Sequence, residues 1–188
     1  MKWVFFIGAG VVLLVAIVAM VGAMLPRDHR ATRQARYRQK PEAIYFTLAG
    51  PVDWRSDVKA SGSLPDRDGR KQWWEQDSHG HKIAYELIED KMPSRRVTRI
   101  AEKNLPFGGT WTIDISPAPE GSVVRITEDG QIHNVIFRFM ARFFFGYTAS
   151  IEGCLRDLGD VSALPPRLHA RSPIHSMSFC CNSSLLGR

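Results

Sequence analysis

The sequence of 188 residues predicts an α+β domain, in which a curved antiparallel sheet surrounds a long C-terminal helix, preceded by one transmembrane helix. Three observations support this prediction. Residues 3–25 contain no ionisable side chain, strand-like segments recur between residues 57 and 129, and residues 135–158 have an apolar stripe at helical spacing. A sheet with one apolar face needs a cover, and the last of these segments is the long helix that can provide it.

The first apolar segment is long enough to cross a membrane. At about 1.5 Å per residue, a helix over residues 3–25 measures roughly 35 Å, more than a typical hydrocarbon core, and Pro26 ends it. We therefore expect a single-pass membrane helix within residues 1–26. The small residues between Ala19 and Ala23 leave open a cleaved secretory signal, which would make the domain periplasmic or secreted.

Positive charge is concentrated outside the predicted body of the domain. The formal net charge is +6, yet residues 41–164 contain 15 basic and 18 acidic side chains. A nucleic-acid-binding domain would carry a basic patch on its fold, so no nucleic-acid partner is predicted. Residues 27–40 contain six basic side chains and one acidic one, which favours contact with anionic headgroups and a cytoplasmic domain. A solvated linker is the alternative interpretation.

The elements follow in a recognisable order. Residues 27–40 are expected to include the first strand, and residues 41–50 a short helix with Pro41 in its first turn. Further strands are predicted over residues 57–64, 70–77, 82–90, 95–103, 109–116 and 122–129. Turn sequences such as PDRDG, SHGH and PAPEG separate several of them. Gly130 indicates a bulge or bend, and Asn134 a helix cap.

The phenylalanine-rich segment IFRFMARFFFGY belongs to the predicted long helix. Its apolar stripe consists of Ile136, Phe139, Met140, Phe143, Tyr147, Ile151, Leu155 and Leu158. Arg138 and Arg142 lie on the other side, and the segment is too short to span a bilayer. We therefore expect it to cover the sheet. The Pro-, Ser- and Arg-rich residues 164–188 are predicted to be a disordered extension.

Five motifs carry a resemblance to a known family: KPEAIYFTLAGPVDWRSDV, LPDRDGR, FGGTWTIDI, GSVVRITEDGQIHNVIFRFMARFFFG and IEGCLRDL. Over about residues 28–160 they resemble the START-like helix-grip (SRPBCC) superfamily, in its polyketide cyclase/dehydrase and lipid-transport branch. The pattern is similar to that of small membrane-anchored or secreted bacterial members. The resemblance implies a pocket between the sheet and the long helix for a hydrophobic or lipid-like ligand. It implies no single reaction, because members range from lipid carriers to cyclases.

Aromatic and aliphatic side chains on the converging elements are the predicted ligand contacts. They are Trp54, Trp73, Tyr85, Trp111, Ile113, Phe139 and Phe143. Trp73 and Trp74 are neighbours on one strand, so only one of them can face inward. Such pockets are mostly apolar with a few polar groups, although a solidly packed core would produce the same sequence pattern.

Catalytic and metal-binding signals are weak. Glu128, at a strand end, and His133, just before the long helix, are candidate proton carriers. His79 and His81 form an H-x-H whose best third ligand is Asp77, and a solvated polar loop is the preferred interpretation. No nucleophile elbow, phosphate loop or dinucleotide fingerprint occurs, so neither a metal nor a cofactor is predicted.

Four segments and three functional hypotheses result. The segments are a membrane helix (1–26), a basic segment with the first strand (27–40), the remainder of the ligand-binding domain (41–163) and the tail (164–188). The first hypothesis is a membrane-anchored, non-catalytic domain that binds a hydrophobic or lipid-like small molecule. The second is a cyclase- or dehydrase-type enzyme that uses a pocket His or Glu. The third is a protein-interaction module with an apolar patch around Phe144 and Phe145 and an unspecified partner.

Overall fold

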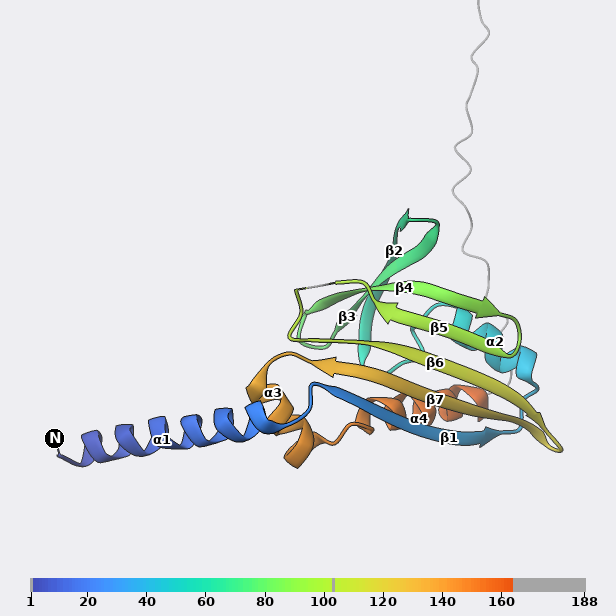
Figure 1. The fold of residues 1–188 in the computed structure, drawn as a ribbon. Coiled ribbons are helices and arrows are strands. Elements are labelled where there is room, and N and C mark those ends of the chain that lie inside the picture. Colours follow the sequence, from blue (N-terminus) through green and yellow to red (C-terminus); the bar gives the residue numbers. More distant parts are fainter. Residues whose placement is uncertain (1, 103, 164–188) are drawn as a thin grey trace, which may run out of the picture.

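The structure is a computed structural model that describes residues 2–102 and 104–163. A seven-stranded antiparallel sheet forms its body, in the order β1-β7-β6-β5-β4-β3-β2 (Figure 1). The strands are β1 (Asp28–Tyr37), β2 (Val58–Arg67), β3 (Arg70–Asp77), β4 (Lys82–Lys91), β5 (Arg95–Ile100), β6 (Phe107–Ala118) and β7 (Gly121–Ile132). Each strand from β2 to β6 pairs with the next one along the chain, and β1 pairs with β7.

Helices cover one face of this curved sheet. The helical elements are α1 (Lys2–Met24), α2 (Pro41–Ala49), α3 (Val135–Met140), the π-helical turn η1 (Ala141–Phe145) and α4 (Ala149–Ala163). Figure 1 shows α2 and α4 behind the sheet, whereas α1 projects away from it beside α3. The predicted α+β helix-grip architecture is therefore confirmed, including the C-terminal helix against the sheet.

The core lies between α4 and the inner face of the sheet. Ile151 and Leu158 of α4 are completely buried, as are Val124 and Ile126 of β7. The same cluster includes Ala31, Tyr37, Ile44, Tyr45, Ile113, Ile115, Cys154 and Leu155. This packing explains the alternating pattern predicted for residues 122–129, because every second side chain of β7 faces α4.

The helical segment is not continuous, contrary to the prediction of one helix from residue 135 to about residue 158. It is broken at Gly146, whose φ of +73° is a left-handed conformation that glycine adopts without strain. The predicted cap Asn134 does begin α3, because its side chain accepts hydrogen bonds from the backbone nitrogens of Ile136 and Phe137. The break makes α3–η1 a separate unit, which packs on α1 instead of extending α4.

Gly130 does not form the predicted bulge. Its register with Gly109 of β6 and His29 of β1 continues without a shift. A side chain at position 130 would overlap the imidazole ring of His29. The glycine therefore leaves room for an inward-facing histidine.

The end of α1 is attached to α3 by close packing. Gly22 is buried against the backbone of Val135, where any side chain would overlap the carbonyl oxygen of Val135. Arg138, expected on the solvent side, is instead buried, and its Nη1 donates a hydrogen bond of 2.8 Å to the carbonyl oxygen of Leu25. That carbonyl lies just beyond the last turn of α1, where backbone acceptors lack helical partners.

By length and composition, α1 could span a membrane. It has 23 residues, and its most apolar 18-residue window has a mean hydropathy of 3.0 and is unburied by the rest of the chain. The basic segment that follows is mostly β1, and part of its charge is paired. Arg33 Nε lies 2.8 Å from Glu152 Oε1, and Arg30 Nε lies 3.5 Å from Asp129 Oδ1. The predicted tail lies outside the described residues.

Candidate functional site

The inner face of the sheet presents a connected set of side chains towards the helices. Pairing partners point to the same face of a sheet, so the pairs Trp73–Tyr85 and Trp111–Glu128 fix which side each residue occupies. Between this face and the segment from α3 to the start of α4 lies a cavity of about 400 Å³. The cavity is not filled by the core, which is packed mainly beneath α4.

Aromatic rings form much of the cavity wall. Trp73 and Tyr85 stack with ring centroids 5.8 Å apart and planes inclined by 20°, and Trp111 lies on the next pair of strands. Phe137 and Phe145 contribute from α3 and η1. Flat apolar walls of this kind favour a ligand that contains rings, because stacked and edge-on aromatic contacts are attractive beyond simple burial.

A histidine and a carboxylate lie together on one side of the cavity. His29 Nε2 is 3.7 Å from Glu128 Oε1, and the imidazole stacks on Tyr147 with centroids 4.4 Å apart. Burial raises the pKa of the Glu128 carboxyl above its ordinary value, although His29, Trp111 and Ser150 act in the opposite direction. The carboxyl therefore keeps its proton to a higher pH than a solvated glutamate does.

A second polar cluster lies on the opposite side. The Arg55 guanidinium contacts Asp57 at 2.6 Å and Glu75 at 2.9 Å, and the Trp73 indole donates to Glu75 at 2.8 Å. Burial alone would lower the pKa of Arg55, but hydrogen bonding to Asp57 and the charge of Glu75 raise it. Burial also raises the pKa of Tyr85. Arg55 is thus a permanent, well-held cation at the cavity wall.

A smaller cavity of about 360 Å³ adjoins the first one, nearer α2. Both cavities are lined by Arg55, Trp73, Glu75, Thr98 and Trp111. The two cavities therefore share part of their walls, and we call them the two compartments of the interior. Trp111 faces both compartments.

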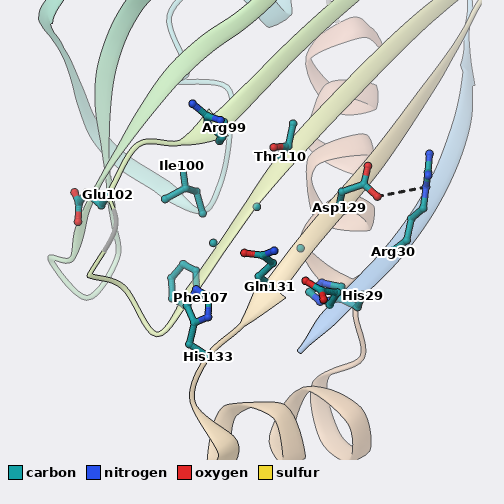
Figure 2. A pocket seen from close by; sticks show the side chains of 14 residues that line it. His29, Arg30, Arg99, Ile100, Glu102, Phe107, Thr110, Asp129, Gln131 and His133 are labelled. Carbon is teal, nitrogen blue, oxygen red and sulfur yellow. Dashed lines mark ion pairs between the residues drawn. The ribbon is translucent and has the colours of Figure 1, made fainter. Parts of the chain in front are cut away.

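A larger hollow lies elsewhere, at the strand ends near the start of β1 (Figure 2). It measures about 860 Å³ and is open, with polar side chains around much of its rim. Arg30 and Asp129, register partners on the neighbouring strands β1 and β7, pair at one side of it, and both side chains are exposed. Because its charges face water and one another, we regard the cavity with aromatic walls as the better candidate site.

The predicted site residues are distributed over these spaces. Trp73, Tyr85, Trp111 and Glu128 line the 400 Å³ cavity together. Trp54 and Ile113 line the smaller compartment. His133 borders the outer hollow, and its side chain is exposed (Figure 2). It lines neither of the two interior compartments.

Phe139 and Phe143 line neither interior compartment, which corrects the prediction made for them. Their rings contact each other with centroids 4.8 Å apart. The physical reason is the break at Gly146. Because the helix does not continue from η1 into α4, these rings do not share the face of α4 that packs on the sheet. Trp74 also points outward, where the Lys82 ammonium lies 4.3 Å from its ring centroid.

Sequence reasoning missed several polar residues of the cavity, among them His29, Arg55 and Glu75. No functional role was predicted for His29, although its place two residues before the buried Ala31 on β1 puts it on the inner face. Arg55 lies in a turn, and its partner Glu75 is distant in sequence. No local signal indicates that pairing. The exposed cluster of Asp77, His79 and His81 does not contribute to the cavity.

Replacing Glu128 by Gln is expected to stabilise the protein at neutral pH. The folded protein holds the Glu128 proton more tightly than the unfolded chain, so this residue's contribution to stability is full below the unfolded pKa of about 4.3. It falls as pH rises and is lost above the raised folded pKa. The variant should therefore gain in free energy of unfolding, relative to wild type, between pH 4 and pH 7. Urea unfolding followed by tryptophan fluorescence measures this difference.

Glu152→Gln is the matched control, with the opposite sign. Hydrogen bonding to Arg33 lowers the pKa of Glu152, so that carboxylate stabilises the fold above its unfolded pKa and stops doing so as pH falls. The Glu152→Gln variant should therefore have a lower free energy of unfolding than wild type, and this difference should grow as pH rises. A Glu128→Gln variant that behaves like Glu152→Gln would contradict an unfavourably buried Glu128.

No protein-family model matches the sequence, and no curated protein matches it significantly. Solved structures do match its fold. The di-domain ARO/CYC BexL from the BE-7585A biosynthetic pathway matches with a TM-score of 0.59 and 11% identity, covering 77% of this chain and 53% of that one. The di-domain ARO/CYC StfQ from the steffimycin pathway matches with a TM-score of 0.57 and 13% identity, covering 72% and 51%.

TTHA0849 from Thermus thermophilus also matches, with a TM-score of 0.54 and 21% identity, and the match covers 72% of this chain and 96% of that one. The chain thus spans about half the length of the two ARO/CYC proteins and nearly all of TTHA0849. Identities this low are informative about architecture alone. The chain therefore has the helix-grip fold found in polyketide cyclase-like proteins.

Proposed function

We propose that this protein is a membrane-tethered domain that binds a hydrophobic, ring-containing small molecule with at least one polar group. The observation that carries the proposal is the cavity of about 400 Å³ with aromatic walls and ionisable groups on two sides. Ligand sites in proteins typically measure about 300–1,000 Å³ and combine apolar walls with a few placed polar groups. The fold shared with polyketide cyclase-like proteins agrees with such a cavity.

The wall chemistry narrows the class of ligand. Rings stack on Trp73 and Tyr85, and a hydroxyl or carbonyl group finds partners at Glu128 or His29. A lipid-like chain would need only apolar surface, since each buried methylene contributes about 0.8 kcal/mol. The paired charges around Arg55 favour a neutral polar group over a free anion, because Asp57 and Glu75 already compensate the guanidinium.

Native mass spectrometry of the full chain, released from detergent micelles, tests this proposal. We expect a retained small molecule after purification, or one-to-one binding of added 2-naphthol, a two-ring probe with one hydroxyl group. Decane-1-ol, which has a hydroxyl but no ring, is the comparison and should bind more weakly. Spectra without any bound molecule or probe would overturn the binding proposal.

A second function is favoured by the environment of Glu128. A carboxyl group with a raised pKa beside an imidazole can donate a proton to a ligand in the cavity or accept one from it, which is the requirement for general acid–base catalysis. In this reading a C–H acid next to a carbonyl group gives its proton to the Glu128 carboxylate and regains one from it. Deuterium exchange at the α-carbon of 1-tetralone, followed by NMR, distinguishes the two functions. Exchange that is equally fast with wild type and Glu128→Gln would leave binding as the sole function.

The tether and its orientation belong to the same proposal. The length and hydropathy of α1 support a single membrane span, and the basic residues that follow it support a cytoplasmic domain. A reporter that is active only in the cytoplasm, fused to the C-terminus, tests this orientation. Loss of α1 from the mature protein would favour the cleaved-signal alternative.

A further inference from the structure

The α3–η1 segment exposes an unusual amount of apolar surface. Its five exposed large apolar side chains lie within ten consecutive positions: Ile136, Phe137, Phe143, Phe144 and Phe145. Other exposed apolar residues of the domain, such as Phe46 and Met92, are isolated. A contiguous apolar patch on an otherwise polar domain marks an interaction surface.

The attachment of α3 to α1 determines where this patch lies. Gly22 packs against the Val135 backbone, and Arg138 binds the carbonyl oxygen of Leu25. Figure 1 shows α3 beside the C-terminal end of α1, with the following turn on the same side of the domain. When α1 occupies a bilayer, the patch is therefore at the level of the membrane surface.

The charge of the segment suits such a surface. Residues 130–151 contain Arg138 and Arg142 but no Asp or Glu. Arg142 is exposed, beside the exposed rings of η1. Phenylalanines with neighbouring arginines and no acids are typical of segments that lie in the interfacial layer of an anionic membrane. The segment is too short to span a bilayer, and interfacial insertion does not require it to do so.

The same segment borders the candidate binding cavity. Phe137, Ala141, Phe145 and Gly146 line the 400 Å³ space from the side of α3–η1. Phe144 does not line it and is more exposed than its neighbours. Phe137 and Phe145 thus belong to both the cavity wall and the apolar patch, so one short element connects the two.

We propose that α3–η1 inserts into the interfacial layer of the bilayer that holds α1, so that the cavity opens towards the lipid phase. This inference rests on the membrane tether of the proposed function. It names the lipid surface as the partner of the patch and the source of the ligand. An apolar ligand then enters from the bilayer without crossing water.

A fluorescent label at position 144 tests the insertion in the full chain, reconstituted in phosphatidylcholine–phosphatidylglycerol vesicles. Cys180 and Cys181 are replaced by Ser, and Phe144→Cys carries an NBD group. Cys154 remains, because it is buried and its thiol pKa is raised to about 11 by that burial. We expect spin-labelled lipids to quench the label at least threefold more than in the Phe46→Cys control, an equally exposed site on α2 at a distance from α1 (Figure 1).

Two further variants test the role of α1. Gly22→Leu places a side chain where the Val135 backbone lies, whereas Gly10→Leu extends into open space on the same helix. Gly22→Leu should at least halve the quenching at position 144, and Gly10→Leu should leave it unchanged. Equal quenching at positions 144 and 46 would overturn the insertion. Unchanged quenching in Gly22→Leu would overturn its dependence on α1.

These results remain distinguishable from failure of the proposed function. If the protein binds 2-naphthol in detergent but shows no quenching at position 144, the insertion is wrong and the binding function stands. If the protein does not stay with the vesicles during flotation, the tether itself is wrong, and the insertion is overturned with it.

Discussion

Replacing Trp111 by Ala is expected to weaken the binding of 2-naphthol by about tenfold or more. Trp111 lines both interior compartments, and its indole also reaches the Glu128 carboxyl. An aromatic contact contributes about 0.5–1.5 kcal/mol beyond area burial, and about 1.4 kcal/mol corresponds to a tenfold change in affinity. A native mass spectrometry titration, with dissociation constants compared between variants, measures the effect.

Trp54→Ala provides the matched comparison, because Trp54 is also a partly buried tryptophan but lines only the smaller compartment. It should change the affinity for 2-naphthol less than threefold. Circular dichroism spectra of both variants must retain the wild-type form. A larger loss in Trp54→Ala than in Trp111→Ala would identify the compartment near α2 as the binding site.

Leu158→Ala is expected to destabilise the protein by about 2–5 kcal/mol, the usual range for removing a large aliphatic side chain from a packed core. Leu158 is completely buried and belongs to the cluster that α4 forms with β1, β6 and β7. Its loss removes packing between the C-terminal helix and the sheet. Urea unfolding of the full chain in detergent, followed by tryptophan fluorescence, measures the change.

Arg156→Ala on the same helix is the control. Arg156 is exposed, so its replacement should change the free energy of unfolding by no more than about 0.5 kcal/mol. Equal effects of the two substitutions would mean that α4 is not held by the sheet in solution.

Periodicity predicted the sheet and its inward-facing residues well, because each strand repeats a two-residue pattern that burial imposes directly. Ile113 and Ile126 have polar neighbours on both sides, and Val124 has one on its C-terminal side; all three are buried. The same reasoning placed Trp111 on this inner face, whereas the side that Glu128 faces was not predicted. A local pattern suffices wherever one face of an element contacts the core along its whole length.

The helical segment was harder to predict, since its apolar residues serve two different surfaces. Ile151, Leu155 and Leu158 pack on the sheet, whereas Phe143 and Phe144 face away from it. Helical spacing cannot separate these groups. The break at Gly146, with its left-handed backbone conformation, separates them.

The pairs of polar side chains in the site could not be predicted from the sequence, for a different reason. His29 and Glu128 are 99 positions apart and meet only because β1 pairs with β7. Arg55 and Glu75 likewise meet through a turn that no periodic pattern marks. Long-range pairs of this kind follow from the strand order, which the sequence does not state.

The short connection between α1 and β1 limits how far the domain can travel. Only Leu25, Pro26 and Arg27 separate the two elements, and three extended residues reach about 10 Å. With α1 in a bilayer, the protein cannot ferry cargo across the aqueous gap between two compartments. A domain tethered in this way would take up and release a bound molecule close to the same membrane surface.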